Sequence, residues 1–114
     1  MPYLKIQTNQ NLPLEGTRNL AKKASALVAR LLGKPESYVM TSVENTPAMT
    51  FAGTEEPLAF LELKSIGLPF ERNTEFCDRL CMLINELLGV PPKRVYIEFM
   101  VTERHMFGWN SQTF

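Results

Sequence analysis

The residue with the clearest potential for chemistry is the proline that directly follows the first methionine. Methionine is generally removed before a small residue, and its removal before Pro2 would leave a free secondary amine. An α-amino group titrates at about pH 8, and an apolar pocket beside a cation lowers its pKa further, so the amine would act as a general base. The alternative is that Pro2 only starts an edge strand, where its missing N–H costs nothing. If Met1 is retained, the Pro2 nitrogen is an amide and offers no lone pair.

Lys34 could supply the cation, because it follows Gly33 at the predicted end of a helix. A lysine there compensates the negative end of the helix dipole, which is the simpler interpretation, but it can also face a pocket. The chain contains an internal repeat at an offset of 56 residues, and the second copy has Val90 where the first has Lys34. This difference between the copies favours a role for Lys34 in a site.

Three aromatic residues, Phe107, Trp109 and Phe114, lie within the last eight residues. Because chain ends are disordered by default, aromatic residues at an end need a surface that buries them. Two interpretations are compatible with each other. The tail packs against a neighbouring subunit, or it forms the rim of a pocket for a small molecule.

The other reactive residue types do not form a recognisable site. Cys77 and Cys81 lie one helical turn apart on an apolar stripe, which is typical of small buried hydrophobic residues. No further cysteine or nearby histidine completes a metal site with them. His105, the single histidine, lies in a polar turn where we expect it to be solvated, and the isolated glycines form no phosphate loop. We therefore expect neither a metal nor a cofactor.

The hydrophobic pattern predicts the elements that position these residues. Alternating apolar residues predict strands, with a short edge strand in the tail, over residues 3–8, 38–44, 58–65, 95–101 and 107–109. Apolar residues at three- and four-residue spacing predict one helix over 15–32 and a second that is capped by Asn73 or Thr74 and ends at Gly89. The repeat makes this a duplicated β-α-β unit, and right-handed crossovers put both helices on one face of a four-stranded mixed sheet. We expect a single α/β (α+β) domain over residues 1–114.

The two faces of the predicted sheet differ in what covers them. The helix-covered face is apolar and holds Leu4, Ile6, Val39, Val43, Leu61, Leu63, Val95, Ile97 and Phe99. The uncovered face is mixed and holds Tyr3, Lys5, Met40, Ser42, Phe60, Glu62, Tyr96, Glu98 and Met100. This second face is too apolar for water and too charged for a dry core, which favours a symmetric oligomer with a wet interior. A ferredoxin-like monomer with the same element order is the alternative.

Composition limits which binding partners and which cellular compartment we expect for the protein. Twelve basic and twelve acidic residues give a formal net charge of zero, so we expect no binding to nucleic acid or to a membrane. Hydrophobic residues make up 45% and charged residues 21%, which is a globular balance. Two cysteines favour a reducing compartment, so we expect a cytoplasmic protein. The first residues have no signal-peptide pattern, so we expect any export to use another route.

Six short motifs occur in order along almost the whole chain. They are Met1-Pro2, Gly33-Lys34-Pro35-x-x-Tyr38, Phe51-x-Gly53-x-x-Glu56-Pro57, Ser65-Ile66-Gly67, Arg94-Val95-Tyr96-Ile97 and Gly108-Trp109-Asn110-Ser111-x-Thr113-Phe114. Together, and in register with the duplicated unit, they resemble the macrophage migration inhibitory factor family. The resemblance implies a homotrimer in which three four-stranded sheets surround a central channel, with sites between subunits.

The resemblance also implies an activity, that of a cofactor-independent keto–enol tautomerase for phenylpyruvate-like or dopachrome-like substrates, with Pro2 as the catalytic base. By the same resemblance, Lys34 and the backbone N–H of Ile66 bind the carboxylate of a small aromatic α-keto acid. Tyr96 of a neighbouring subunit lies beside the substrate carbonyl. The rim that selects an aromatic substrate is formed by Tyr38, Phe107, Trp109 and Phe114.

One departure from the family pattern changes the expected activity. Glu98 occupies a position where the animal member of this family, a cytokine, has asparagine. A carboxylate near the Pro2 amine favours its protonated form and weakens the base. We therefore expect weak activity or a raised pH optimum.

Other departures concern functions besides tautomerisation. Leu58 and Leu61 replace the two cysteines of a redox motif, so we expect no thiol oxidoreductase activity. The receptor-contact positions of the family around residues 11–14 and at Thr46 also do not match, which argues against cytokine signalling. The alternative to an enzyme is a cytokine-type module of the same fold that binds a protein partner and has a vestigial catalytic site.

Overall fold

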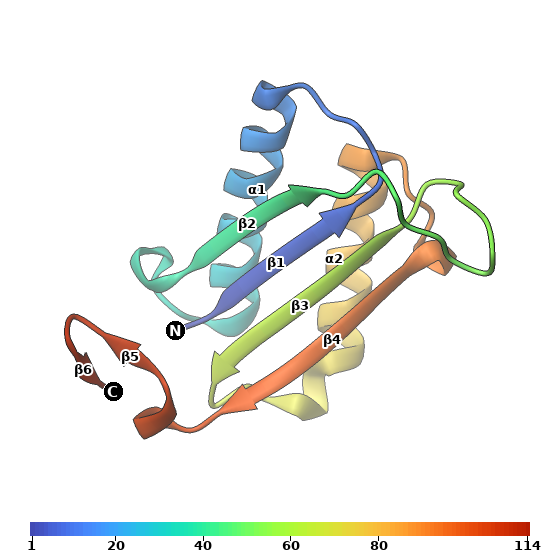
Figure 1. Ribbon diagram of the computed structural model, residues 1–114. Helices are drawn as coiled ribbons and strands as arrows, with labels where there is room; N and C mark the ends of the chain where they lie inside the picture. Colours follow the sequence, from blue (N-terminus) through green and yellow to red (C-terminus); the bar gives the residue numbers. More distant parts are fainter.

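Four strands form one mixed sheet in the computed structural model, which describes residues 1–114 (Figure 1). The strands are β1 (Tyr3–Thr8), β2 (Met40–Asn45), β3 (Ala59–Ile66) and β4 (Val95–Thr102), in the order β2-β1-β3-β4. β1 pairs in parallel with β2, and β3 pairs in parallel with β4, while the central β1–β3 pair is antiparallel. Parallel neighbours joined by a helix are what a β-α-β unit produces, so the duplicated unit predicted from the repeat is confirmed.

Two helices, α1 (Leu14–Leu32) and α2 (Asn73–Leu88), cover the same face of the sheet (Figure 1). α1 ends at Gly33 and α2 at Gly89, both with positive φ, which a glycine adopts without strain. The predicted cap of α2 is wrong, because no side chain caps this helix. Instead, Arg72 before the first turn forms a bidentate ion pair with Glu75, with N–O distances of 3.1 and 2.9 Å.

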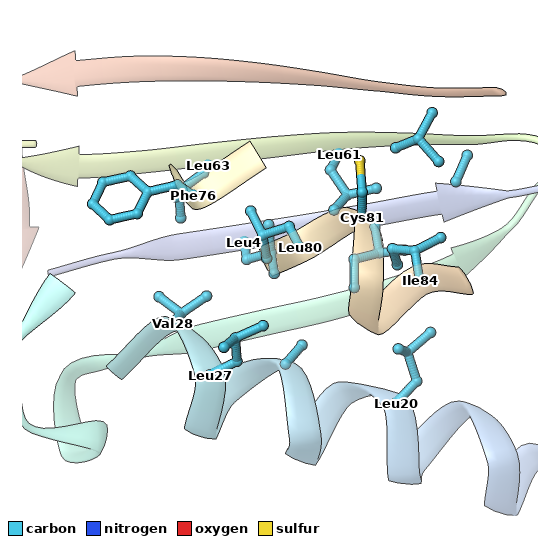
Figure 2. Packing of buried hydrophobic residues seen from close by; sticks show 14 of the residues in the cluster. Leu4, Leu20, Leu27, Val28, Leu61, Leu63, Phe76, Leu80, Cys81 and Ile84 are labelled. Atoms are coloured by element: carbon cyan, nitrogen blue, oxygen red, sulfur yellow. The ribbon is translucent and has the colours of Figure 1, made fainter. Parts of the chain in front are cut away.

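The hydrophobic core fills the space between the sheet and the two helices. On the sheet side it contains Leu4 and Ile6 of β1 with Leu61 and Leu63 of β3, all fully buried. Figure 2 shows several of these residues packed against helical side chains, among them Leu20 and Val28 of α1 and Phe76, Leu80 and Ile84 of α2. Cys81 lies in this core and Cys77 packs against it, which confirms their role as small hydrophobic residues.

The opposite face of the sheet is not covered by any element of the chain (Figure 1), and we call it the open face. Its exposed residues include Met40, Tyr96 and Met100. Charged residues lie side by side across its centre, because Lys5 pairs in register with Glu62 and Glu62 with Glu98. The mixed, uncovered face predicted from the sequence is therefore confirmed.

Two expected strands differ from those in the structure. β2 begins at Met40, two residues later than predicted, because Glu36–Tyr38 form a 3₁₀ turn after Pro35. The tail does not add an edge strand to the sheet. Instead, β5 (Gly108–Trp109) pairs with β6 (Gln112–Thr113) in a separate hairpin, whose two turn residues both have positive φ. Turns of this kind match the twist of a two-stranded hairpin.

Neither helix combines the length and the apolar character that are needed to cross a bilayer.

Candidate active site

Pro2 lies at the start of β1, where parallel pairing brings the beginning of β2 beside it. Its side chain is buried, and its carbonyl oxygen accepts a hydrogen bond of 3.0 Å from the backbone N–H of Met40. A cavity of about 220 Å³ opens at this point, and we call it the Pro2 cavity. It is lined by Met1, Pro2, Tyr3, Ser37, Tyr38, Val39, Met40, Phe107, Gly108, Trp109 and Phe114. The structure thus brings Pro2 together with all four residues predicted for the rim.

The aromatic rim is a packed cluster that attaches the tail hairpin to the rest of the chain. The rings of Trp109 and Phe114 are stacked, with centroids 5.8 Å apart and planes 9° apart. Tyr38 contacts both of them edge-on, at 5.6 and 6.4 Å. Phe107 contacts Phe114 at 6.1 Å, and the Phe114 N–H donates to the Phe107 carbonyl at 3.1 Å. The tail therefore forms the rim of a pocket within a single chain, which is one of the two interpretations given above.

Lys34 is fixed by the end of α1 and reaches toward the end of β3. Its backbone N–H donates to the Ala29 carbonyl at 3.0 Å, which closes the turn after the helix. Its Nζ donates to the Ile66 carbonyl at 3.1 Å, so the ammonium lies beside the Ile66 backbone. None of the ion pairs in the chain involves Lys34, so its charge is not neutralised by a carboxylate. Lys34 and Ile66 are thus brought together, but neither of them lines the Pro2 cavity.

The Met1 amine at the start of the chain is affected by its partial burial and by the charge of Lys34. Burial lowers the pKa of the Met1 amine below its ordinary value, and the positive charge of Lys34 lowers it further. Both effects disfavour a charged amine. They act on the residue directly before Pro2 and shift the Met1 amine toward its neutral form.

Tyr96 does not reach the Pro2 cavity of its own chain. Figure 1 shows the starts of β1 and β4 at opposite ends of the sheet. Tyr96 pairs with Phe60 and Phe60 with Gln7, five residues along β1 from Pro2. Five residues of strand span about 16 Å, and two strand spacings add about 10 Å sideways.

Tyr96 instead contributes to a second cavity of about 330 Å³, which we call the Tyr96 cavity. This cavity is lined by Met49, Thr50, Phe51, Ala52, Leu58, Ala59, Phe60 and Tyr96. Glu98 lies on the open face beside Glu62, also away from the Pro2 cavity of its own chain. One chain therefore holds two separated groups of site residues, and only a second copy could bring them together.

Several residues of the Pro2 cavity were not predicted from the sequence. Val39 and Met40 line it because β2 pairs in parallel with β1, so the residues that enter β2 lie next to those that enter β1. Tyr3 and Ser42 are joined across this pair by a hydroxyl–hydroxyl hydrogen bond of 2.8 Å. The β-α-β repeat was the signal that could have identified these neighbours.

The remaining reactive residues lie outside the Pro2 cavity. His105 is exposed, as predicted, and its Nε2 lies 3.3 Å from a carboxylate oxygen of Glu103. No group of three or more His, Cys, Asp and Glu side chains is arranged to hold a metal ion. Burial and the neighbouring Cys77 raise the pKa of the Cys81 thiol to about 11, so this sulfur is unreactive.

Comparisons with known proteins agree on one family. The family model described as macrophage migration inhibitory factor (MIF) matches residues 1–114. A macrophage migration inhibitory factor homolog from Brugia malayi is 41% identical over 116 residues, covering 100% of this chain and 99% of its own. The structure of a homologue from Prochlorococcus marinus has 39% identity and a TM-score of 0.92 over 98% of both chains. That of the Toxoplasma gondii protein has 31% identity and a TM-score of 0.92, over 98% of this chain and 99% of its own.

Proposed function

The chain belongs to the macrophage migration inhibitory factor family, and on this basis we propose that it is a cofactor-independent keto–enol tautomerase. Its substrates are small aromatic α-keto acids of the phenylpyruvate or dopachrome type. Pro2 is the catalytic base once Met1 has been removed. The working form is a homotrimer, in which the open faces of three sheets surround a central channel.

One observation carries this proposal: partial burial and an unneutralised cation, Lys34, lower the pKa of the amine that precedes β1. The Lys34 ammonium is held by the Ile66 carbonyl at 3.1 Å, and it contributes to the lowered pKa of the Met1 amine. Removal of Met1 transfers the free amine to Pro2, which is buried beside an apolar cavity. A neutral secondary amine in such a place has the properties of a general base near neutral pH.

The proton transfer needs no group beyond the substrate and the chain. The Pro2 nitrogen removes a proton from the carbon next to the substrate carbonyl, and the electron pair of the broken C–H bond forms the C=C bond. The electron pair of the C=O π bond moves to the oxygen, which takes the same proton back from the Pro2 nitrogen and becomes the enol hydroxyl, so Pro2 is neutral again. The aromatic ring of the substrate packs among Tyr38, Trp109 and Phe114, whose planar side chains suit a planar ligand.

The substrate is oriented through its carboxylate. Lys34 binds it through a charge-assisted hydrogen bond, and the backbone N–H of Ile66 adds a second donor. Tyr96 of a neighbouring subunit lies beside the carbonyl, which accounts for its separation from Pro2 within one chain. The same neighbour brings Glu98 toward the amine, where a carboxylate favours the protonated base and lowers the activity near neutral pH.

A second candidate function is a protein-binding module with a vestigial site. Two features favour it. Glu98 weakens the base if it approaches the amine, and a retained Met1, which lines the cavity, converts the Pro2 nitrogen to an amide. The same fold would then present its surface to a protein partner.

A single experiment separates the two functions. Mass spectrometry first establishes that Met1 is absent, and phenylpyruvate tautomerisation is then followed against pH for the wild type and for Pro2→Gly. A positioned general base contributes about a hundredfold to ten-thousandfold, so we expect the glycine variant to lose about that factor in kcat/KM. We also expect the wild-type profile to show an apparent pKa below that of a free α-amino group.

The matched control is Pro47→Gly, a substitution of an exposed proline far along the sequence from the site. It should retain wild-type activity, and the mass in solution should remain that of a trimer for both variants. A processed wild type that does not exceed the uncatalysed rate would reject the enzyme and favour the binding module. Equal catalysed rates for the wild type and Pro2→Gly would reject the need for proline, because glycine also offers an α-amine.

A further inference from the structure

Arg94 is a buried guanidinium that has no acidic partner. Only 8% of its surface is exposed, and it lies at the end of the 3₁₀ turn Pro92–Arg94, directly before β4. Buried charges are normally paired with an opposite charge, yet no ion pair in the chain involves Arg94. Its environment therefore has to satisfy the guanidinium in another way.

Four backbone carbonyls accept the hydrogen bonds of this side chain. Nε donates to Pro57 at 2.9 Å and Nη1 to Phe51 at 3.1 Å. Nη2 donates to Thr54 at 3.3 Å and to Glu56 at 3.0 Å. All four acceptors belong to residues 51–57, which we call the clamp segment. The segment is folded around the guanidinium.

Besides Arg94, the side chain of Asn9 holds the clamp segment, because its Nδ2 donates to the Glu55 carbonyl at 2.8 Å and to the Glu56 carbonyl at 3.4 Å. The segment contains one isolated bridge between Phe51 and Thr54, closed by a tight turn at Ala52 and Gly53, both of which have positive φ. Such a short turn is marginal on its own. The planar fork of an arginine can hold several carbonyls at once, and a lysine, with a single nitrogen, cannot reproduce this.

Phe51 connects the clamp segment to Tyr96. The guanidinium carbon of Arg94 lies 5.2 Å from the centre of the Phe51 ring, within the range of a cation–π contact. On the other side, the Phe51 and Tyr96 ring centroids are 4.7 Å apart. Tyr96 itself is 66% exposed, and its hydroxyl has no hydrogen-bond partner within the chain. The Phe51 ring therefore packs against the Tyr96 side chain, and Phe60 is the in-register neighbour of Tyr96 on β3.

We propose that Arg94 is a positioning residue for tautomerisation: it holds the clamp segment so that Phe51 fixes the orientation in which Tyr96 is presented to the Pro2 cavity of a neighbouring subunit. This inference rests on the proposed function, because it gives Tyr96 its task at the substrate carbonyl. Arg94 acts only through Tyr96 and does not contact the substrate.

The test is a double-mutant cycle of Arg94→Lys and Tyr96→Phe, assayed with phenylpyruvate. Misplacement of a positioned group by about 1 Å can cost up to a hundredfold, so we expect Arg94→Lys to lower kcat/KM by about tenfold, mainly through a higher KM. The apparent pKa of the base should not move. In the Tyr96→Phe background, where the hydroxyl is already absent, Arg94→Lys should have no further effect.

The matched control is Arg72→Lys, which alters an exposed arginine paired with Glu75 and should leave the kinetics unchanged. Phe51→Leu is a second route, because it removes the aromatic support while the backbone carbonyl of residue 51 remains available to Arg94. It should reproduce the rise in KM even if Arg94→Lys fails to fold. Fully additive effects of the Arg94 and Tyr96 substitutions would overturn the proposal.

A second measurement does not depend on activity. The protein is labelled with fluorotyrosine, and the ¹⁹F resonance of Tyr96 is assigned by its loss in Tyr96→Phe. Arg94→Lys should shift and narrow this resonance while those of Tyr3 and Tyr38 remain in place. If the wild type is inactive but the Tyr96 resonance changes in Arg94→Lys, the tautomerase function is rejected while the effect of Arg94 on Tyr96 stands. If the Tyr96 resonance does not change, the positioning role of Arg94 is rejected.

Discussion

The two β-α-β units have the same architecture but different residues at corresponding points. Each helix ends at a glycine with positive φ, Gly33 or Gly89, and the next residue is Lys34 in the first unit and Val90 in the second. Lys34 is partly exposed and extends its ammonium to the Ile66 carbonyl, whereas Val90 is fully buried in the core. The same backbone turn therefore leads to a hydrogen-bonded ammonium in one unit and to hydrophobic packing in the other.

The difference continues into the following 3₁₀ turns. The turn of the first unit ends at Tyr38, on the rim of the Pro2 cavity. The turn of the second unit ends at Arg94, whose guanidinium is bound by carbonyls of the clamp segment. In the proposed site, the first unit provides Pro2 and Lys34, and the second provides the Ile66 N–H, Tyr96 and the residues that support Tyr96. Duplication supplied the scaffold twice, and the two copies diverged into complementary parts of one proposed site.

The largest effect is expected when the charge of the first unit is placed in the second. Val90→Lys puts an ammonium into a core position with no exposed surface and no acidic partner. The free energy of unfolding should fall by about 4 kcal/mol or more, and urea denaturation measures it. Leu14→Lys, at an exposed position at the start of α1, is the control and should change it little. A variant Val90→Lys as stable as the control would show that the second turn can also accommodate a cation.

The reciprocal exchange, Lys34→Val, should affect catalysis more than folding. Loss of the charge-assisted hydrogen bond to the carboxylate predicts a fall in kcat/KM of about tenfold to a hundredfold, mostly through KM. The apparent pKa of the base should rise, because a cation that disfavours its protonated form is gone. The acidic limb of the pH–rate profile therefore moves to higher pH. Lys93→Val, at an exposed position in the second unit, is the control, and equal kinetics for the two variants would contradict the role of Lys34.

The smallest change, and the only one expected to improve the enzyme, is Glu98→Asn. In the proposed trimer a neighbouring subunit brings Glu98 toward the amine, so removing this carboxylate should lower the apparent pKa of the base. We expect a rise in kcat/KM of a few-fold at neutral pH and a smaller rise at high pH, where the base is already neutral. Glu103→Asn changes an exposed glutamate outside the sheet and is the control. A flat or lower rate for Glu98→Asn would remove this account of Glu98.

Much of the fold was predictable because periodicity reports burial. The even-numbered residues of β1 and the odd-numbered residues of β3 face the core, and their alternation in the sequence located both strands to within a residue. Tyr38 was placed in a strand wrongly, because a three-residue 3₁₀ turn has no periodic signal. The tail hairpin was missed because its turn uses Asn110 and Ser111 at positive φ, where glycine is the usual indication.

The candidate site was less predictable than the fold. The amine chemistry of Pro2 followed from its residue type, but the roles of Ile66 and Tyr96 came from the resemblance to a family. No pattern in the sequence indicated that Tyr96 lies far from Pro2 within a chain, since that depends on strand order. Arg94 was overlooked as a structural centre because its partners are backbone carbonyls, which every residue has.

Residues 1 and 114 line the same cavity, and this has a practical consequence for how the protein can be handled. An affinity tag fused before Met1 would block the release of the Pro2 amine. A tag fused after Phe114 would project from the aromatic rim of the Pro2 cavity, where the proposed substrate binds. Neither terminus is a neutral attachment point, so recombinant protein for the assays above should carry a tag that is cleaved without leaving residues, or none.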